Sequence, residues 1–153
     1  MTAPASACPA CPPSPPCPLC SSAGGTLLWR NDALRVIEVD MPGYPGYLRV
    51  IWNQHRAEMS DLSEAERAQL MDTVMLAERV LRDTLAPDKV NLAALGNMVP
   101  HLHWHIIPRW RDDPHFPDAI WATPHREPDP QRESARRAKL AACRQALLEA
   151  LAR

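Results

Sequence analysis

The alternation of apolar and polar residues predicts five short strands in this chain. The segments "TLLWR" (26–30) and "ALRVIEV" (33–39) flank the turn-forming pair Asn31-Asp32, which is typical of a β-hairpin. Further strands are predicted at 46–52 ("GYLRVIW"), 89–95 ("KVNLAAL") and 101–107 ("HLHWHII"). Because of the hairpin, the sheet is expected to be at least partly antiparallel.

Two other segments have helical spacing. Ser63 and Glu66 form a capping-box sequence, and Pro87 prevents the helix from continuing. Between these points, apolar residues recur at helical intervals: Leu70, Val74, Ala77, Leu81 and Leu85. The segment 131–152 is predicted as a second, amphipathic helix, with an apolar face made of Leu140, Cys143, Leu147 and Leu151. This set of strands and helices predicts an α+β fold.

The chain of 153 residues is long enough for one domain with its own core. Residues 1–16 are rich in proline and cysteine and lack periodicity, so we expect a flexible leader there. Residues 17–153 are expected to form the domain, with a core at 17–110. The segment 109–130 contains many prolines and is expected to be a long irregular loop, followed by the C-terminal helix.

Composition argues against several function classes. The net charge is −1, from 17 basic and 18 acidic residues, which favours neither nucleic acid nor an anionic membrane surface as a partner. No apolar run approaches the ~18 residues of a membrane span. The N-terminal residues have neither the basic nor the apolar region of a secretory signal. We therefore expect a cytoplasmic protein with reduced cysteines.

Three of the six histidines lie within five residues, at positions 101, 103 and 105. In an extended strand His101, His103 and His105 share one face, and the apolar residues between them share the other. The three rings then have three interpretations. They form a polar sheet face, they chelate one metal ion such as zinc, or one ring is a nucleophile that its neighbours orient.

The segment before these histidines favours a phosphate site. It contains Gly96 and Asn97, and glycine allows the backbone to approach a ligand closely. Backbone amides in such a loop can donate hydrogen bonds to an anion. Taken alone, the segment is an ordinary turn, but beside a histidine-rich strand it indicates phosphate binding.

The segment "HLHWHII", with Asn91, Gly96, Val99 and the following Pro108-Arg109, resembles the histidine triad (HIT) family of hydrolases. This family includes diadenosine polyphosphate hydrolases and nucleoside phosphoramidases. The resemblance covers roughly Cys17 to Arg109. It implies a HIT-like fold, with a mostly antiparallel sheet of about five strands, a long internal helix and a C-terminal helix.

The resemblance also implies a mechanism and a set of site residues. His103 would attack the α-phosphorus of a nucleotide, form a nucleotidyl-histidine and release a nucleoside monophosphate after hydrolysis. His105 would bind the phosphate oxygens, and a histidine at this position favours hydrolysis over nucleotidyl transfer. His101 completes the catalytic group. Nucleotide-binding residues would be Asn91, Gly96, Asn97 and, for the ribose, Asp40, with Glu38 as the alternative to Asp40.

One departure from the family bears on the leaving group. Many relatives have serine or threonine three residues before the first triad histidine, where this chain has Met98. A thioether cannot donate a proton. The departure puts phosphoramidate cleavage in question.

Some relatives bind a structural zinc ion through a Cys-x-x-Cys pair and two histidines. By resemblance the ligands here would be Cys17, Cys20, His55 and His101. A four-cysteine knuckle of Cys8, Cys11, Cys17 and Cys20 competes with this site, as do reduced cysteines without metal. No organic cofactor is expected.

Three alternatives to the hydrolase stay open. They are a non-catalytic nucleotide- or zinc-binding module, a nucleotidyl transferase of the same superfamily, and a hydrolase whose three histidines bind one catalytic zinc. By analogy with relatives we expect a homodimer that acts on a small nucleotide substrate.

Overall fold

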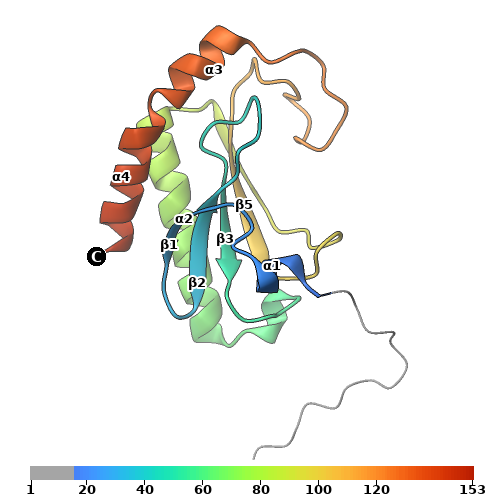
Figure 1. The fold of residues 1–153 in the computed structure, drawn as a ribbon, viewed down its shortest axis with the longest axis vertical. Helices are drawn as coiled ribbons and strands as arrows, with labels where there is room; N and C mark the ends of the chain where they lie inside the picture. The colour runs from blue at the N-terminus through green and yellow to red at the C-terminus, as the bar shows by residue number, and fades with distance from the viewer. Residues whose placement is uncertain (1–15) are drawn as a thin grey trace, which may run out of the picture.

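All five predicted strands are present, and each pairs antiparallel with its neighbours (Figure 1). The computed structural model describes residues 16–153, so almost all of the expected leader 1–16 lies outside the described residues. The strand order in the sheet is β1-β2-β3-β5-β4. The strands are β1 (Thr26–Arg30), β2 (Leu34–Glu38), β3 (Leu48–Trp52), β4 (Lys89–Ala93) and β5 (His103–Arg109). The expected α+β fold with an antiparallel sheet is confirmed.

The hairpin and the long helix form for the reasons that the sequence indicates. Asn31 closes the turn between β1 and β2, since its side-chain oxygen accepts from the amides of Ala33 and Leu34. The long helix α2 runs from Glu64 to Leu85. It begins at a complete capping box, in which Ser63 and Glu66 each accept from the other's amide. It ends at Leu85, with Ala86 as the C-cap directly before Pro87.

The C-terminal segment differs from the single helix expected over 131–152. It forms two helices, α3 (Pro130–Arg137) and α4 (Leu140–Leu151), which run in different directions (Figure 1). Helix α3 has no buried residue, and its Arg136 pairs with Asp112 in the loop after β5. Helix α4 instead buries Leu140, Cys143 and Leu147. The two halves therefore bend apart because they pack on different supports.

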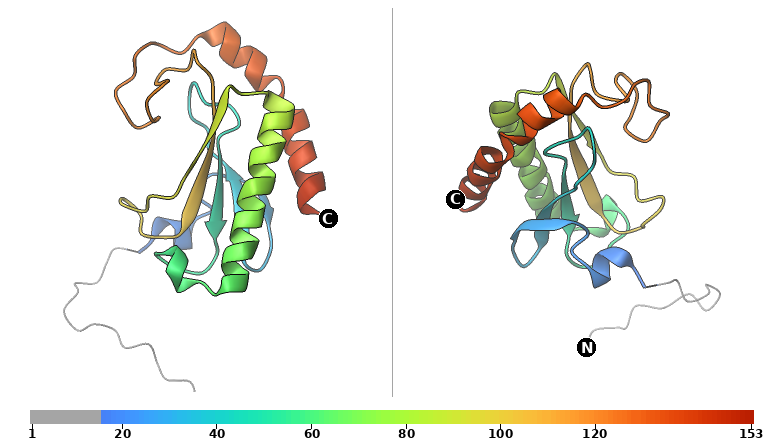
Figure 2. Two further views of the ribbon diagram at one scale, coloured as in Figure 1. Left: turned by 180° about the vertical axis from the view of Figure 1, so that it is seen from behind. Right: turned by 45° about the horizontal axis from the view of Figure 1, so that its top comes forward.

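The largest apolar core lies between the sheet and the helices α2 and α4, which both lie on one side of the strands (Figure 2). Alternate strand residues supply it, including Val36, Val50 and Ile106. The opposite face of the sheet carries two smaller clusters. In one, Leu19 of the four-residue helix α1 (Pro18–Ser21) packs on Ile37 and Ile51. The candidate site lies on this second face.

Two short elements were not expected from the sequence, namely helix α1 and a 3₁₀ turn, η1 (Met59–Asp61). The buried guanidinium of Arg35 holds α1 against the sheet, because it donates to the carbonyls of Leu19, Ser22 and Ala23. In the part of the chain that the structure describes, no helix is long and apolar enough to span a membrane.

Candidate functional site

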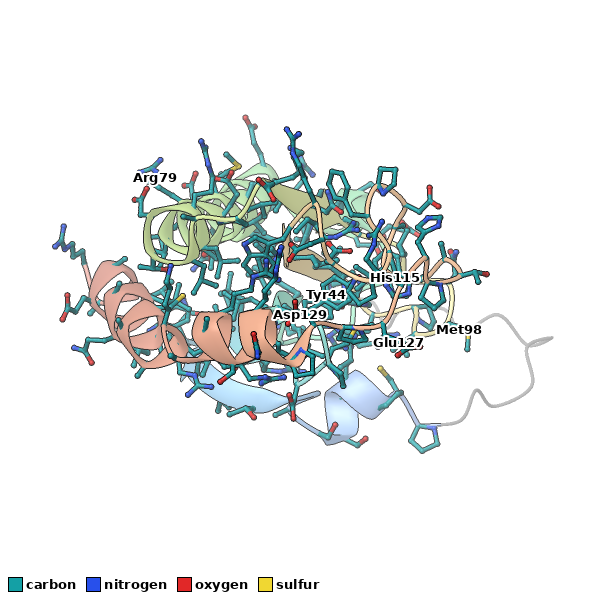
Figure 3. The ribbon with its side chains drawn as sticks, turned by 90° about the horizontal axis from the view of Figure 1, so that it is seen from above. Tyr44, Arg79, Met98, His115, Glu127 and Asp129 are labelled. Atoms are coloured by element: carbon teal, nitrogen blue, oxygen red, sulfur yellow. The ribbon has the colours of Figure 1, made fainter. Side chains whose placement is uncertain are left out.

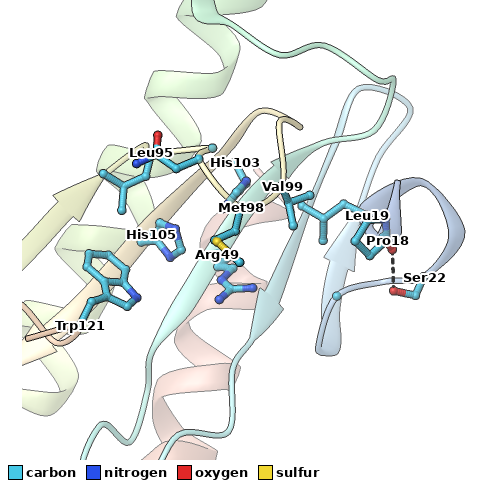
Figure 4. Close-up of a pocket in the computed structure, with 13 residues that line it drawn as sticks. Pro18, Leu19, Ser22, Arg49, Leu95, Met98, Val99, His103, His105 and Trp121 are labelled. Atoms are coloured by element: carbon cyan, nitrogen blue, oxygen red, sulfur yellow. Dashed lines mark hydrogen bonds between the residues drawn. The ribbon is translucent and has the colours of Figure 1, made fainter. Parts of the chain in front are cut away.

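Strand β5 brings two of the three clustered histidines into one pocket. Its register with β3 places His103 opposite Ile51 and His105 opposite Arg49. Both histidines and Arg49 line a pocket of about 540 Å³ on the second face of the sheet (Figure 4). The intervening Trp104 and Ile106 contact the helix-side core. His101 lies two residues before the start of β5 and does not line this pocket.

His103 is held in one orientation and one tautomer. Its Nδ1 lies 2.6 Å from the backbone carbonyl oxygen of His101, which can only accept, so Nδ1 carries the proton. Burial lowers the pKa of His103 below its ordinary value, which favours the neutral ring. A neutral ring protonated at Nδ1 has its lone pair on Nε2. His103 is therefore prepared to act as a nucleophile.

His105 has the opposite tautomer. Its Nδ1 lies 2.5 Å from the hydroxyl oxygen of Tyr47, and burial raises the pKa of that phenol, which stays protonated. Arg49 donates to the same hydroxyl oxygen from Nε and Nη2, at 3.4 Å each. The phenol hydrogen is thus directed at Nδ1 of His105. Burial, with His103 and Arg49 nearby, lowers the pKa of His105 to about 3. The neutral ring then carries its proton on Nε2, as a hydrogen-bond donor.

The loop between β4 and β5 forms a second wall of the pocket. Gly96 has φ +74°, a conformation that favours glycine, and both Gly96 and Asn97 line the pocket. Among residues 16–153, no acceptor is found for the backbone amides of these two residues. Free amides beside two histidines suit an anionic ligand. Met98 also lines the pocket, and 93% of its surface is exposed (Figure 4).

Trp121 supplies an aromatic wall from the long loop after β5. Its ring lies 5.1 Å from that of His105 in an edge-on arrangement, and about half of its surface is exposed. The loop is fixed by a buried ion pair, with Arg109 Nε 2.6 Å from Asp113 Oδ2. Tyr44 bonds both to Asp113 and to His115 (Figure 3). Arg109 thus supports the loop.

Two predicted nucleotide-binding residues do not lie in this pocket. Asn91 accepts a hydrogen bond from Arg109 at 2.6 Å and lines a separate hollow of about 490 Å³ along β4. Asp40 is exposed and accepts from Arg137 of α3. Its alternative, Glu38, forms a two-bond ion pair with Arg144 of α4. The structure therefore brings together Gly96, Asn97, His103 and His105, but not Asn91 or Asp40.

A second cluster joins the start of β5 to α1. The ligand atoms of Cys17, Cys20, His55 and His101 all lie within 4.8 Å of one another. The Nδ1 atom of His101 lies 3.4 Å from the Cys17 sulfur and 3.5 Å from the Cys20 sulfur, and His55 Nδ1 lies 3.4 Å from the Cys20 sulfur. Sulfur and nitrogen ligands of one tetrahedral zinc ion are about 3.5 Å apart.

The surroundings of His101 also fit a metal ligand. Its Nε2 lies 2.6 Å from the backbone oxygen of Trp52, so that nitrogen carries the proton and Nδ1 is left with a lone pair toward the two sulfurs. The four predicted zinc ligands therefore fit that ion in number, chemistry and spacing. Cys8 and Cys11 of the competing knuckle lie outside the described residues. In the described part of the chain, the three clustered histidines do not form a metal-binding group together.

Comparison with known proteins identifies the family. The family model of the HIT domain matches residues 23–112, more than half of the chain. The chain belongs to the HIT family. A solved structure of a HIT protein from Bradyrhizobium japonicum is similar, with a TM-score of 0.66 and 28% identity over 83% of this chain and 90% of that one.

Two curated relatives have names that state an activity. An AP-4-A phosphorylase of Mycobacterium tuberculosis is 35% identical over 81 residues, which cover 49% of this chain and 42% of the relative. A bis(5'-adenosyl)-triphosphatase of Saccharomyces cerevisiae is 32% identical over 76 residues, 46% of this chain and 37% of the relative. The chain thus matches less than half the length of either relative.

Sequence reasoning missed two residues of the candidate site, Tyr47 and Arg49. Both lie in the predicted third strand, where "GYLRVIW" gives no sign of special chemistry. Their role depends on the register between β3 and β5, which the sequence does not specify. Trp121, which also lines the pocket, lies beyond the segment that the family model matches.

Proposed function

We propose that this HIT protein is a nucleotide hydrolase that cleaves a phosphoanhydride or phosphoramidate bond at the α-phosphorus. The observation that carries the proposal is the pair of contacts in one pocket between His103 Nδ1 and the His101 carbonyl and between His105 Nδ1 and the Tyr47 hydroxyl. From these contacts we infer a lone pair on Nε2 of His103 and a proton on Nε2 of His105. The assigned activities of the two curated relatives support the class of substrate.

The proposed reaction has two steps. His103 Nε2 attacks the α-phosphorus, and the bond to the leaving group breaks, which gives a nucleotidyl-histidine. Water then attacks the same phosphorus and releases the nucleoside monophosphate. The Nε2–H of His105 and the amides of Gly96 and Asn97 donate to the phosphoryl oxygens as negative charge develops on them. The carbonyl of His101 keeps His103 in place in both steps.

We further propose that Cys17, Cys20, His55 and His101 hold a structural zinc ion. The fit of their spacing to a tetrahedral zinc site supports this assignment. The ion would complete a closed four-ligand site that links α1 to the start of β5, and it takes no part in the proposed reaction.

The proposal is tested with diadenosine tetraphosphate and adenosine 5′-phosphoramidate as substrates. We expect release of AMP and, after a denaturing quench at alkaline pH, where the phosphorus–nitrogen bond to histidine is stable, a nucleotidyl adduct on the peptide that contains His103. His103→Ala should lower turnover at least ~1,000-fold. His125→Ala is the matched control, since His125 is exposed and pairs only with Asp118 among the described residues. An unaltered rate in His103→Ala would overturn the mechanism.

Phosphorolysis is the second candidate, favoured by the assigned name of the Mycobacterium tuberculosis relative. In that case phosphate, not water, accepts the nucleotidyl group, and the product from diadenosine tetraphosphate is ADP. Running the assay with and without inorganic phosphate separates the two reactions. Release of AMP both with and without phosphate supports a hydrolase. Formation of ADP only when phosphate is present supports a phosphorylase.

A further inference from the structure

Arg49 is the one arginine or lysine side chain, among the described residues, that lines the histidine pocket. It lies on β3 opposite His105, on the same face of the sheet (Figure 4). Within residues 16–153, its guanidinium makes two long hydrogen bonds, both to the Tyr47 hydroxyl. A guanidinium offers five donors, so most of those on Arg49 are available to a ligand.

The neighbouring arginines are already engaged. Arg35, on the adjacent strand, donates to backbone carbonyls of the α1 segment. Arg109 pairs with the buried carboxylate of Asp113. By contrast, none of the ion pairs within residues 16–153 includes Arg49. A half-buried arginine without a carboxylate partner is suited to a ligand that brings its own negative charge.

Proton donors for a departing group are scarce in this pocket. The thioether of Met98 has no proton to give, and the hydroxyl of Ser22 donates to the carbonyl of Pro18 at 2.8 Å. An amine leaves only after it gains a proton, so a phosphoramidate needs an acid here. A phosphate oxygen leaves as an anion, because its conjugate acid has a pKa of about 6. The departing phosphate oxygen is therefore stabilised by a nearby cation and does not require a proton.

We infer that Arg49 is a specificity-determining residue that binds the leaving phosphate group and selects substrates whose leaving group is a polyphosphate anion. The inference rests on the proposed function. As the bond from His103 Nε2 to the α-phosphorus forms, the bond from phosphorus to the bridging oxygen breaks. The electron pair stays on that oxygen, whose new charge faces the guanidinium of Arg49. No proton is transferred in this step.

The test compares two substrates that share the adenylyl group and differ in the leaving group, diadenosine tetraphosphate and adenosine 5′-phosphoramidate. Arg49→Met removes the charge and keeps much of the length, while Arg49→Lys keeps the charge and loses the planar fork. We measure kcat/KM for both substrates. Any indirect effect through Tyr47 and His105 acts on both substrates alike, so the ratio of the two values isolates the leaving group.

We expect Arg49→Met to lower kcat/KM about 30-fold more for the tetraphosphate than for the phosphoramidate. Arg49→Lys should fall between the wild type and Arg49→Met. An unchanged ratio in Arg49→Met would overturn the inference, even if both rates fall.

A binding measurement separates failure of this inference from failure of the proposed function. Titration of ATP and of AMP into His103→Asn, with and without Arg49→Met, does not depend on turnover. We expect the arginine to make ATP bind more tightly than AMP and its removal to abolish that difference. If the wild type cleaves neither substrate, the proposed function fails. Loss of the ATP preference on adding Arg49→Met would still support binding of the anion by Arg49. An ATP preference that persists in the variant with Arg49→Met would contradict the inference about Arg49.

Discussion

At the scale of single residues, the site is defined by which nitrogen of each histidine carries the proton. The carbonyl of His101 sets this for His103, and the hydroxyl of Tyr47 sets it for His105. Two rings of the same chemistry thereby become an electron-pair donor and a hydrogen-bond donor. The difference comes from atoms around the rings and not from the rings themselves.

Tyr47 is therefore predicted to be a positioning residue. Tyr47→Phe keeps the buried ring but removes the hydrogen directed at His105 Nδ1. We expect kcat to fall about 10- to 100-fold, with little change in KM, because donation from His105 matters most in the transition state. The ¹⁵N chemical shifts of the His105 ring should show loss of the Nε2–H form. Unchanged shifts together with unchanged kcat would refute this role.

At the scale of elements, the sequence predicted the helices and strands that are marked by a local pattern of residues. Alternation fixed the strands, and the Ser63–Glu66 capping box marked the start of α2. Helix α1 was missed because tertiary bonds from Arg35 hold its few residues in place. The break between α3 and α4 was missed because an amphipathic pattern does not reveal that the two halves have different supports.

In the candidate site too, only the residues placed by a local pattern could be predicted from the sequence. His103 and His105 share a face because side chains alternate along one strand, which sequence spacing shows directly. Arg49 joins them only through the pairing of β3 with β5, and Trp121 only through the fold of the loop that Arg109 and Asp113 fix. These are long-range contacts, which no local pattern encodes.

The link between α1 and β5 leads to a prediction about metal content. We expect about one zinc ion per chain by elemental analysis and a lower Tm after chelation, since four-ligand zinc sites stabilise the folded state. Cys17→Ser should lose the metal. Cys8→Ser/Cys11→Ser should retain it if His55 and His101 are ligands. Metal loss in that double variant would instead favour the four-cysteine knuckle.

At the scale of the whole molecule, the sheet divides the chain into two regions. One face packs on α2 and α4 and holds the large apolar core, while the other carries polar groups and smaller apolar clusters. The segments of the pocket come from α1, β3, the β4–β5 loop, β5 and the loop that contains Trp121. Only the complete fold brings them together. Assembly as a homodimer stays a prediction.

His105 is buried in its neutral form on the face of the sheet opposite α2 and α4, and this makes the stability of the fold depend on pH. The pKa of His105 is about 3 in the folded protein, against 6.5 for an exposed histidine, so the unfolded chain binds the proton first as pH falls. The stability from this group is complete above about pH 6.5 and decreases from there toward about pH 3. His103 and Arg49, which face the ring, act in the same direction.

His105→Gln should therefore flatten the pH dependence of unfolding. We expect the wild type to lose about 1 to 2 kcal/mol more than this variant between about pH 7 and pH 5, as measured by urea unfolding. Other titrating groups are common to both proteins and cancel in the comparison. Parallel curves for the two proteins would show that His105 is not buried in its neutral form.

His101 belongs to two systems at once, and this limits what mutagenesis at that position can reveal. Its side chain lies in the cysteine–histidine cluster and bonds to Trp52, while its backbone oxygen orients His103. Any substitution of His101 removes the contacts of its side chain, but every substitution keeps the backbone carbonyl that accepts from His103. An inactive His101 variant would thus report a displaced strand, and would not by itself identify the imidazole as a participant in the chemistry.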